Sequence, residues 1–378
     1  MVSRVVVAGG GIGGVATAVA LHQRGVDVVV LERAQEFREI GAGLSLWPNA
    51  MRALDSLGLA AQVRAAGAVE TGGGVRDRAG RWLSRTDNAA IERRHGWPLV
   101  VVHRAELLRI LVSALPASSL LADSEVHAVR QDSFGVEVEH RGGSLRADLV
   151  VAADGLNSTL RRQWWPGAEG PRYVGCTGWR AVTTPLPGLE VEGAVLWGRG
   201  ERAGFTVLPG SRYYVFGAVT APRGAEFDFP GHFAGWPDPL PALLAAVPDG
   251  AVIARDVFEL PPLPTYVCGR VVLLGDAAHA MNPILGQGAC QALEDAVTLA
   301  ACLGGEADVD AALEWYDRER RPRTQSIVRR SARLDAVAQW SWPPAVLARD
   351  LGARLTPARA TLRAMAPVLG WTPAGVGS

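Results

Sequence analysis

The fold is decided by residues 5–32, VVVAGGGIGGVATAVALHQRGVDVVVLE, near the start of the 378-residue chain. A β-branched run at residues 5–8 ends in glycines, and an Ala-rich stretch at residues 15–23 follows with the pattern of a helix. A second apolar run, residues 26–31, stops at Glu32. Strand, glycine turn, helix and strand form a βαβ unit, whose parallel strands are buried on both faces. We therefore predict an α/β protein with a Rossmann-like parallel sheet.

The glycine turn of this unit has the composition of a dinucleotide site. Gly9, Gly11 and Gly14 follow the pattern G-x-G-x-x-G, and Glu32 stands at the end of the second strand. Glycines let the backbone N–H groups at a helix N-terminus approach a pyrophosphate, while the carboxylate accepts hydrogen bonds from ribose hydroxyls. The pattern predicts an ADP-ribose unit and leaves open whether it belongs to NAD or FAD.

Two later segments repeat the arrangement of a buried strand that ends at an acid. Residues 270–296, RVVLLGDAAHAMNPILGQGACQALEDA, place Asp276 at a strand end and Gly286 and Gly288 before a helix, whose N-terminus favours an anion. Residues 147–161, ADLVVAADGLNSTLR, place Asp154 at a second strand end. Asp154 has an equally simple alternative as the N-cap of the following helix.

The rest of the chain divides into three parts. Residues 72–97 and 169–265 contain short alternating strands separated by Gly and Pro, which predict an inserted antiparallel-sheet substrate domain. The dinucleotide-binding domain then comprises residues 1–71, 98–168 and 266–320. Residues 321–378 are predicted to form C-terminal helices, and we expect the helical chain to break at Pro322 and at Pro343-Pro344.

Composition excludes several classes of protein. All 38 basic residues are arginines, which excludes mechanisms that need a lysine amine, such as pyridoxal-phosphate Schiff bases. Zero net charge argues against nucleic-acid binding. The cysteines and histidines form no ligand pattern, so we expect neither disulfides nor a metal site. No apolar run approaches the roughly 20 residues of a membrane helix, and we expect a cytoplasmic protein without membrane contact.

The three motifs, in this order and at these spacings, resemble those of the single-component FAD-dependent aromatic hydroxylases, the para-hydroxybenzoate hydroxylase-like group A flavoprotein monooxygenases. The resemblance extends through residues 41–49, GAGLSLWPN, and 103–108, HRAELL, and is nearest to short salicylate-type and urate-type members. It implies bound FAD, NADPH or NADH as transient electron donor, and reaction with O2 to a C4a-hydroperoxyflavin. The product would be a hydroxylated aromatic or similarly electron-rich small molecule, in natural-product biosynthesis or aromatic catabolism.

The resemblance also assigns roles to residues around the cofactor. Glu32 would meet the adenosine ribose, Gly11 and Gly13 the pyrophosphate, Arg104 the flavin ribityl chain and phosphates, and Asp276 the ribityl chain or pyrophosphate. The full set of cofactor-binding residues that it implies is Gly9, Gly11, Gly13, Gly14, Glu32, Arg33, Ser45, Arg104, Val126, Asp154, Asp276, Pro283, Gly286 and Gly288.

An aromatic or apolar substrate is expected between the flavin and the antiparallel sheet. Strand alternation puts Tyr214 and Phe216 on one face and Tyr213 on the other. Similarity to urate-type relatives singles out Arg202 and Tyr214 as catalytic residues. The expected substrate-binding residues are Trp179, Arg180, Trp197, Phe205 and Phe216. The alternative for each aromatic residue is core packing.

Two other functions remain open: a flavin-dependent epoxidase of a terpenoid or polyketide alkene, and a non-catalytic FAD-binding or ligand-binding homologue. A flavin-dependent halogenase is disfavoured because that class depends on a lysine. The chain could be a monomer or a homodimer. Arginines of residues 318–333 are expected on a solvated face, with NADPH phosphate binding as the alternative. Residues 345–370 are amphipathic and would pack on the FAD domain, cover the active site or touch a membrane, in that order of preference.

Overall fold

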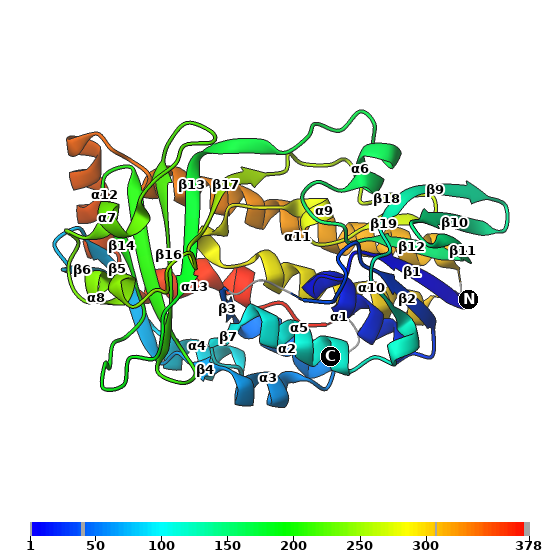
Figure 1. Ribbon diagram of the computed structural model, residues 1–378, viewed down its shortest axis with the longest axis horizontal. Helices are drawn as coiled ribbons and strands as arrows, with labels where there is room; N and C mark the ends of the chain where they lie inside the picture. The colour runs from blue at the N-terminus through cyan, green and yellow to red at the C-terminus, as the bar shows by residue number, and fades with distance from the viewer. Residues whose placement is uncertain (1, 39–41, 307, 374–378) are drawn as a thin grey trace.

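The computed structural model describes residues 2–38, 42–306 and 308–373 (Figure 1). Its six-stranded sheet has the order β18-β19-β12-β1-β2-β8, and all neighbours are parallel except β18 and β19. The strands are β1 (Arg4–Ala8), β2 (Asp27–Leu31), β8 (Leu120–Leu121), β12 (Leu149–Ala152), β18 (Val267–Cys268) and β19 (Val271–Leu273). The predicted Rossmann-like parallel sheet is confirmed.

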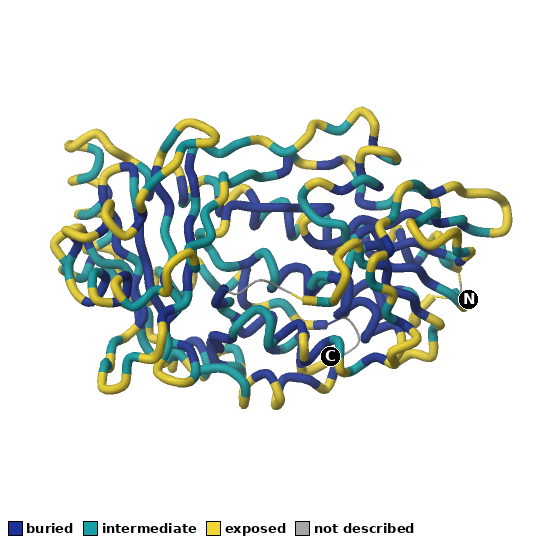
Figure 2. Tube along the Cα trace, viewed as in Figure 1, coloured by how far each residue is buried: buried dark blue, intermediate teal, exposed yellow. Residues whose placement is uncertain are grey.

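This sheet is buried on both faces, as Figure 2 shows by its dark central strands. Its core includes residues of many helices and of a small antiparallel sheet. Among these helices are α1 (Ile12–His22), α5 (Arg104–Ser113), α10 (Gly288–Gly305) and α11 (Val309–Ala338), and the small sheet contains β9 (Val126–Asp132), β10 (Gly135–His140) and β11 (Gly143–Ala147). Burial on both sides explains why β1, β2 and β12 are nearly pure runs of Val, Leu and Ala.

The second large sheet has seven strands in the order β17-β13-β16-β15-β14-β5-β6. They are β5 (Gly72–Asp77), β6 (Trp82–Asp87), β13 (Arg172–Val182), β14 (Ala194–Trp197), β15 (Glu201–Leu208), β16 (Arg212–Thr220) and β17 (Ile253–Glu259). The sheet is mixed and not purely antiparallel as predicted, because β14 and β5 pair in parallel with Val195 opposite Val75. Two segments distant in the chain thus join one sheet.

The outer face of the seven-stranded sheet, on the left in Figure 1, is covered by α7 (Phe229–Phe233) and α8 (Leu240–Ala245). These helices were not predicted, since both are short and start beside prolines. The inner face looks toward the dinucleotide-binding half. There a three-stranded sheet of β3 (Gly43–Leu46), β7 (Val100–His103) and β4 (Ala68–Val69) joins the two halves.

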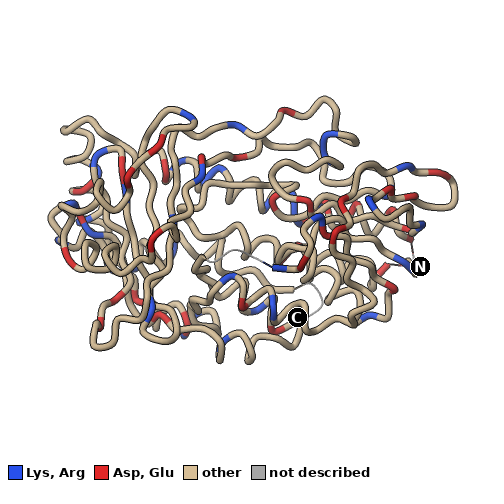
Figure 3. The backbone as a smooth tube through the Cα atoms, in the orientation of Figure 1, with Lys and Arg blue, Asp and Glu red and all other residues tan. Residues whose placement is uncertain are grey.

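The remaining helices are α2 (Pro48–Ser56), α3 (Ala60–Ala66), α4 (Asn88–His95), α6 (Thr159–Trp164), α9 (Asp276–His279), α12 (Pro343–Leu355), α13 (Ala358–Leu369), and the 3-10 turns η1 (Ala117–Ser119) and η2 (Pro283–Leu285). Positive and negative residues are interspersed along the chain (Figure 3). The predicted boundary at Pro343 is confirmed, but the break at Pro322 is wrong because α11 continues through it.

A cluster of ionised side chains lies buried where α9, α10 and α11 meet. Arg320 donates from Nε to Asp295 Oδ1 at 2.6 Å and from Nη1 to Glu294 Oε2 at 2.5 Å. Asp295 Oδ2 accepts from the Gly275 N–H at 3.1 Å and lies 2.6 Å from His279 Nε2. Burial acts to raise the pKa of Asp295, but the charges of His279 and Arg320 bring that pKa down to about 2.

The same cluster explains how α11 passes Pro322. Arg320 is fully buried, and Arg323 donates to both oxygens of Glu294 at 2.7 and 2.8 Å, so the helix is tied to α10 on both sides of the proline. The expectation of a solvated arginine face is therefore wrong for Arg320. Further members of the hydrogen-bonded network are Asn49, Gln287 and Gln291.

We expect Arg320→Met to lower the free energy of unfolding by about 3 to 5 kcal/mol, because Glu294 and Asp295 would stay buried without their shared cation. Urea titration of the variant and the wild type measures this difference. Arg318→Met is the matched control on an exposed position of the same helix, with an expected change within about 0.5 kcal/mol. Equal losses in the two variants would contradict the structural role of the buried cluster.

Candidate active site

The three acid-containing motifs meet at one edge of the parallel sheet. Ala8 of β1 lies opposite Ala152 of β12, and Ala152 lies opposite Leu273 of β19. The glycine turn, the Asp154 turn and the Gly275-Asp276 turn therefore leave adjacent strands at their carboxyl ends, where ligands bind in such folds.

The glycine turn has no room for side chains. A Cβ added to Gly9, whose φ is +112°, would lie 2.3 Å from Ala153 O, and one added to Gly14 would lie 2.0 Å from Gly9 O. Glu32 braces the turn, since its Oε2 accepts from the Gly10 N–H at 2.7 Å. No side chain caps the N-terminus of α1 at Gly11, so its first N–H groups remain available to an anion.

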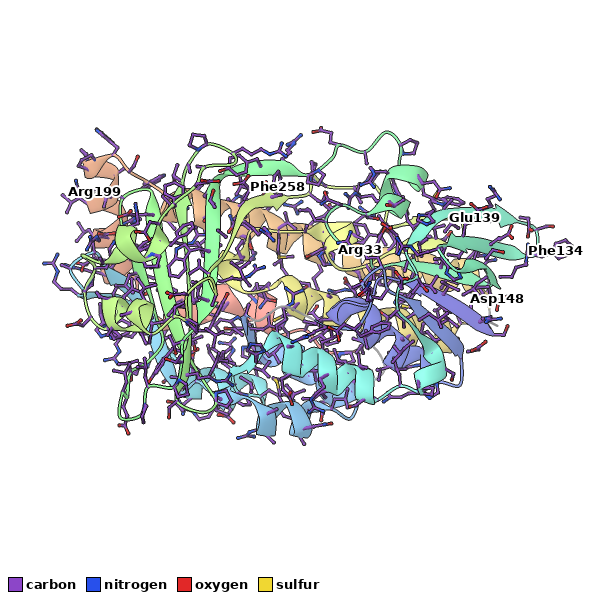
Figure 4. All side chains as sticks on the ribbon, in the orientation of Figure 1. Arg33, Phe134, Glu139, Asp148, Arg199 and Phe258 are labelled. Atoms are coloured by element: carbon purple, nitrogen blue, oxygen red, sulfur yellow. The ribbon has the colours of Figure 1, made fainter. Side chains whose placement is uncertain are left out.

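Gly13 has a packing role, because an added Cβ would lie 2.8 Å from Leu274 and 3.0 Å from Ala292 Cβ. It therefore lets α1 approach α10 closely. Whether the Gly13 backbone also meets a pyrophosphate stays a prediction. Arg33, the neighbour of Glu32, is exposed (Figure 4).

A second part of the site lies at the start of α10. Asp276 is exposed, and a Cβ added to Gly288 would lie 3.9 Å from its Oδ1, so the carboxylate stands beside the helix N-terminus. Gly286, with φ of +61°, adopts a conformation that favours glycine and lies next to the indole of Trp47. The buried Trp47 Nε1 has no hydrogen-bond partner among the described residues. Pro283 is exposed at the start of η2.

Other predicted cofactor residues surround this edge. Ser45 of β3 accepts at its backbone oxygen from Cys290 Sγ at 3.6 Å, which places β3 beside α10. Arg104 begins α5, and its N–H donates to Ala42 O at 2.8 Å. Val126 begins β9. The N-cap of α6 is Ser158 and not Asp154. Asp154 Oδ2 nevertheless accepts from the Thr159 and Leu160 N–H groups at 2.7 and 3.2 Å, so it helps to cap the helix from outside.

The inner face of the seven-stranded sheet brings three of the predicted substrate-side residues together. Arg180 lies opposite Phe216 on neighbouring strands, and the rings of Phe216 and Tyr214 stack with centroids 5.1 Å apart. Gly43 of β3 packs against this group, since a Cβ added there would lie 2.3 Å from Tyr214 Cγ. The absence of a side chain at Gly43 therefore lets the inner face approach the dinucleotide-binding half.

Burial raises the pKa of the Tyr214 phenol to about 12, although the positive charges of Arg180 and Arg104 act to lower it. The phenol is therefore protonated near neutral pH and can donate a hydrogen bond. Arg180 Nε is also buried and has no partner among the residues that the structure describes. The face thus offers two donors beside a stacked aromatic ring.

Two expected substrate contacts are wrong. Trp179 and Phe205 point to the outer face, where both pack in a core with Phe233 of α7. The physical reason is strand alternation, because Trp179 precedes the inward Arg180, and Phe205 follows Gly204, which lies opposite the inward Phe216.

Arg202 and Trp197 are on the inner face but are engaged elsewhere. Arg202 forms a buried ion pair with Asp335 of α11. Its Cα lies opposite Ala218, four residues along β16 from Tyr214, or about 13 Å in an extended strand. Arg202 is therefore held by α11, and its catalytic role stays a prediction. Trp197 packs beneath α12, with the guanidinium of Arg349 5.2 Å from its ring centroid.

Sequence patterns missed Glu70, a carboxylate between the two halves. It follows β4, and its Oε1 accepts from Thr206 Oγ1 at 3.0 Å. Thr206 lies opposite Tyr214 in the sheet. Burial raises the pKa of Glu70 to about 7, and the hydrogen bond from Thr206 offsets only part of that rise. Nothing in the local sequence marks it, because its burial depends on strands far away in the chain.

Among the residues that the structure describes, no helix is long and apolar enough to cross a membrane. In the same residues, no group of three or more His, Cys, Asp or Glu side chains could hold a metal ion.

Glu70 predicts the sign of a pH effect on stability. The Glu70 carboxyl holds its proton more tightly in the folded protein than in the unfolded chain. Its contribution to the free energy of unfolding is therefore full below about pH 4.5 and is lost as the pH rises through about 7. Between about pH 5 and pH 8 we expect the free energy of unfolding of the wild type to fall by roughly 2 to 3 kcal/mol relative to that of Glu70→Gln, as measured by urea titration. Glu226→Gln, at an exposed position, should follow the wild-type profile. Parallel profiles for wild type and Glu70→Gln would refute the assignment.

Four features of this edge fit a bound FAD. They are the tight glycine turn, the uncapped start of α1, the Trp47 Nε1 without a partner among the described residues, and the nearby Asp276.

A family model described as FAD binding domain matches residues 2–228 and 263–331. Aurachin C monooxygenase/isomerase from Stigmatella aurantiaca is 37% identical over 344 residues, which cover 89% of this chain and 90% of that protein. FAD-dependent urate hydroxylase from Klebsiella pneumoniae is 33% identical over 343 residues, covering 86% of this chain and 88% of that protein.

A solved structure agrees with these relatives. The crystal structure of Klebsiella pneumoniae HpxO complexed with FAD and uric acid matches with a TM-score of 0.91 and 28% identity, over 98% of this chain and 98% of that chain. The chain therefore belongs to the FAD binding domain family, and it is a FAD-dependent monooxygenase of the single-component hydroxylase type.

Proposed function

We propose that this protein uses NADPH or NADH and O2 to hydroxylate an electron-rich aromatic small molecule held against the inner face of the seven-stranded sheet. The observation that carries the proposal is the group of Arg180, Tyr214 and Phe216 on the face that packs against Gly43. FAD-dependent relatives that act on aromatic compounds, such as urate hydroxylase, support the same substrate class.

Bound FAD supplies the redox chemistry, since it takes a hydride from NADPH or NADH and activates O2 so that one oxygen atom enters the substrate and the other leaves as water. The chain supplies the binding surfaces. Glu32 and the glycine turn hold the adenosine end, and Asp276 with the N-terminus of α10 holds the flavin end. Ser45, Arg104, Val126 and Asp154 are proposed to complete the surroundings of the cofactor.

The substrate-side residues orient and polarise the ring. Tyr214, protonated near neutral pH, donates to an oxygen of the substrate, and the Arg180 guanidinium stabilises negative charge on that oxygen. Negative charge on a ring oxygen makes the ring carbons more nucleophilic, which favours transfer of an electrophilic oxygen. Phe216 supports the ring from one side.

The C-terminal helix α13 excludes water from the flavin side. Val368 and Leu369 pack in one buried cluster with Met281, and Trp47 and Leu285 contact this cluster. Trp47 lies next to Gly286, and Leu285 precedes it on the loop before α10. A dry site strengthens the electrostatic contacts of Arg180 and protects reactive species from water.

We also propose a cytoplasmic location, which the four free cysteines support because thiols stay reduced in that compartment. The activity is tested by screening phenolic, heteroaromatic and terpenoid compounds for faster NADPH or NADH oxidation, with mass analysis of the products. A phenolic or heteroaromatic product that gains one oxygen atom supports the proposal. An epoxide formed from an alkene, or no acceleration by any compound, would overturn it in favour of an epoxidase or a binding protein.

We expect Asp276→Ala to weaken FAD binding by about 1.5 to 3 kcal/mol, or roughly ten- to a hundredfold in Kd, because it removes a charged hydrogen-bond acceptor. Titration of the apoprotein with FAD, followed by flavin fluorescence, measures the change. Asp55→Ala, which removes an exposed carboxylate from α2, is the matched control and should keep wild-type affinity. FAD retention unchanged by Asp276→Ala would contradict the role of this carboxylate.

We expect Arg180→Met to raise KM for the active aromatic substrate about tenfold or more, because a charge-assisted hydrogen bond contributes roughly 1.5 to 3 kcal/mol. FAD affinity should stay unchanged, which separates a substrate role from a cofactor role. Arg199→Met, at an exposed turn, serves as the control (Figure 4). A variant whose KM equals that of the wild type would remove Arg180 from the substrate site.

A further inference from the structure

The short helix α9 presents a single residue to solvent. Of its four residues Asp276 is exposed, whereas Ala277, Ala278 and His279 are at most 2% exposed. One helical turn is not stable by itself, because the first turn of a helix fixes several residues for one hydrogen bond. No side chain caps the N-terminus of α9. The position of Asp276 therefore depends on contacts of this turn with other parts of the chain.

One buried carboxylate holds both ends of the turn. Asp295 Oδ2 accepts from the Gly275 N–H at 3.1 Å, immediately before Asp276, and lies 2.6 Å from His279 Nε2, three residues after it. An ionised carboxylate can only accept, so His279 Nε2 is the donor. The N–H groups of Ala278 and His279 donate to Gly275 O at 2.9 Å each and close the same turn. Asp276 thus lies between two residues that share one acceptor.

The imidazole of His279 is engaged at one of its two nitrogens. Its Nδ1 is buried and has no hydrogen-bond partner among the described residues. Burial of a polar nitrogen without a partner costs free energy. Within the same part of the chain, the one polar contact of the ring that offsets this cost is the hydrogen bond from Nε2 to Asp295. The chemistry of the ring is therefore directed at the anchor of the Asp276 turn.

We propose that His279 is a positioning residue for the cofactor, which donates to Asp295 and thereby holds α9 so that the Asp276 carboxylate is fixed where FAD binds. Asp295 is a firm anchor, because Arg320 Nε donates to its other oxygen at 2.6 Å. A carboxylate that is held in place before binding loses less conformational entropy when the ligand arrives, so affinity rises. The inference rests on the role proposed above for Asp276 and extends it to a buried residue that acts through Asp276.

A second support of the turn limits what His279 contributes. Arg161 Nη1 of α6 donates to Ala277 O at 2.9 Å. Without the His279 donor, α9 stays attached at Ala277 and at Gly275, and only its C-terminal end is freed. We therefore expect weaker FAD binding in a protein that still folds. A histidine with a purely structural role would instead affect the free energy of unfolding and leave the contribution of Asp276 to FAD binding unchanged.

Two amide substitutions of matched polarity test the inference. The amide nitrogen of His279→Gln reaches the position of Nε2, whereas that of His279→Asn reaches only the position of Nδ1. We expect His279→Asn to raise the Kd for FAD roughly tenfold, as loss of a residue that orients a ligand typically does, and His279→Gln to stay within about threefold of the wild type. Dilution series of the FAD-loaded full-length proteins, followed by flavin fluorescence, measure Kd. Thr298→Val, which removes a buried hydrogen bond elsewhere on α10, is the matched control and should keep the wild-type Kd.

A double-mutant cycle separates positioning from a general loss of structure. In the Asp276→Ala background, His279→Asn should change the Kd for FAD by less than about twofold, because the carboxylate through which it acts is gone. A wild-type Kd for His279→Asn, equal losses for the Asn and Gln variants, or an undiminished loss in the absence of Asp276 would each overturn the inference. Asp276→Ala with wild-type affinity would instead refute the proposed role of Asp276, on which the inference rests.

A variant of the anchor keeps the test independent of whether His279→Asn folds. Asp295→Asn has the same shape but turns one acceptor oxygen into a donor, so Gly275 and His279 can no longer both be satisfied. We expect it to weaken FAD binding in the otherwise wild-type protein and to have little effect on Kd in the Asp276→Ala background. Equal losses in the two backgrounds would contradict the inference as well.

Discussion

The buried contact of Arg320 with Glu294 and Asp295 is the constraint on which the site depends. It joins α11 to α10, and through Asp295 it reaches the Gly275 N–H and His279 on either side of Asp276. Burying these charges is costly, so each must keep its partner. The cluster therefore ties Asp276 and the start of α10 to α11 at the edge of the sheet where the cofactor motifs meet.

A second constraint is that the two faces of the seven-stranded sheet have different surroundings. Its outer face is a conventional core under α7 and α8, and its inner face carries Arg180, Tyr214 and Phe216. Successive side chains of a strand point to opposite faces of the sheet. The neighbours Trp179 and Arg180 therefore lie on different faces and have different surroundings. Gly43 completes the arrangement by letting the inner face approach β3.

Prediction from sequence succeeded where the chemistry is local. The parallel sheet, the glycine turn with Glu32, and the strand end at Asp276 could be recognised because each depends on residues close together in the chain. The substrate side was predicted less well. Trp179 and Phe205 proved to be core residues, and Arg202 proved to be paired with Asp335, a residue 133 positions away. Glu70 and the Arg320 cluster gave no local signal, since their burial is produced by long-range packing.

By itself, the sequence determined the α/β class, the FAD-type cofactor motifs and the exclusion of lysine chemistry, because backbone turns and side-chain composition act over short distances. Only the tertiary structure decided which face of the substrate sheet meets the flavin side and which arginines are buried as structural ions. Those outcomes depend on how segments distant in the chain pack together. Whether an arginine lies beside an aromatic ring on the inner face or is tied to a distant helix is set by its neighbours in space, as Arg180 and Arg202 show.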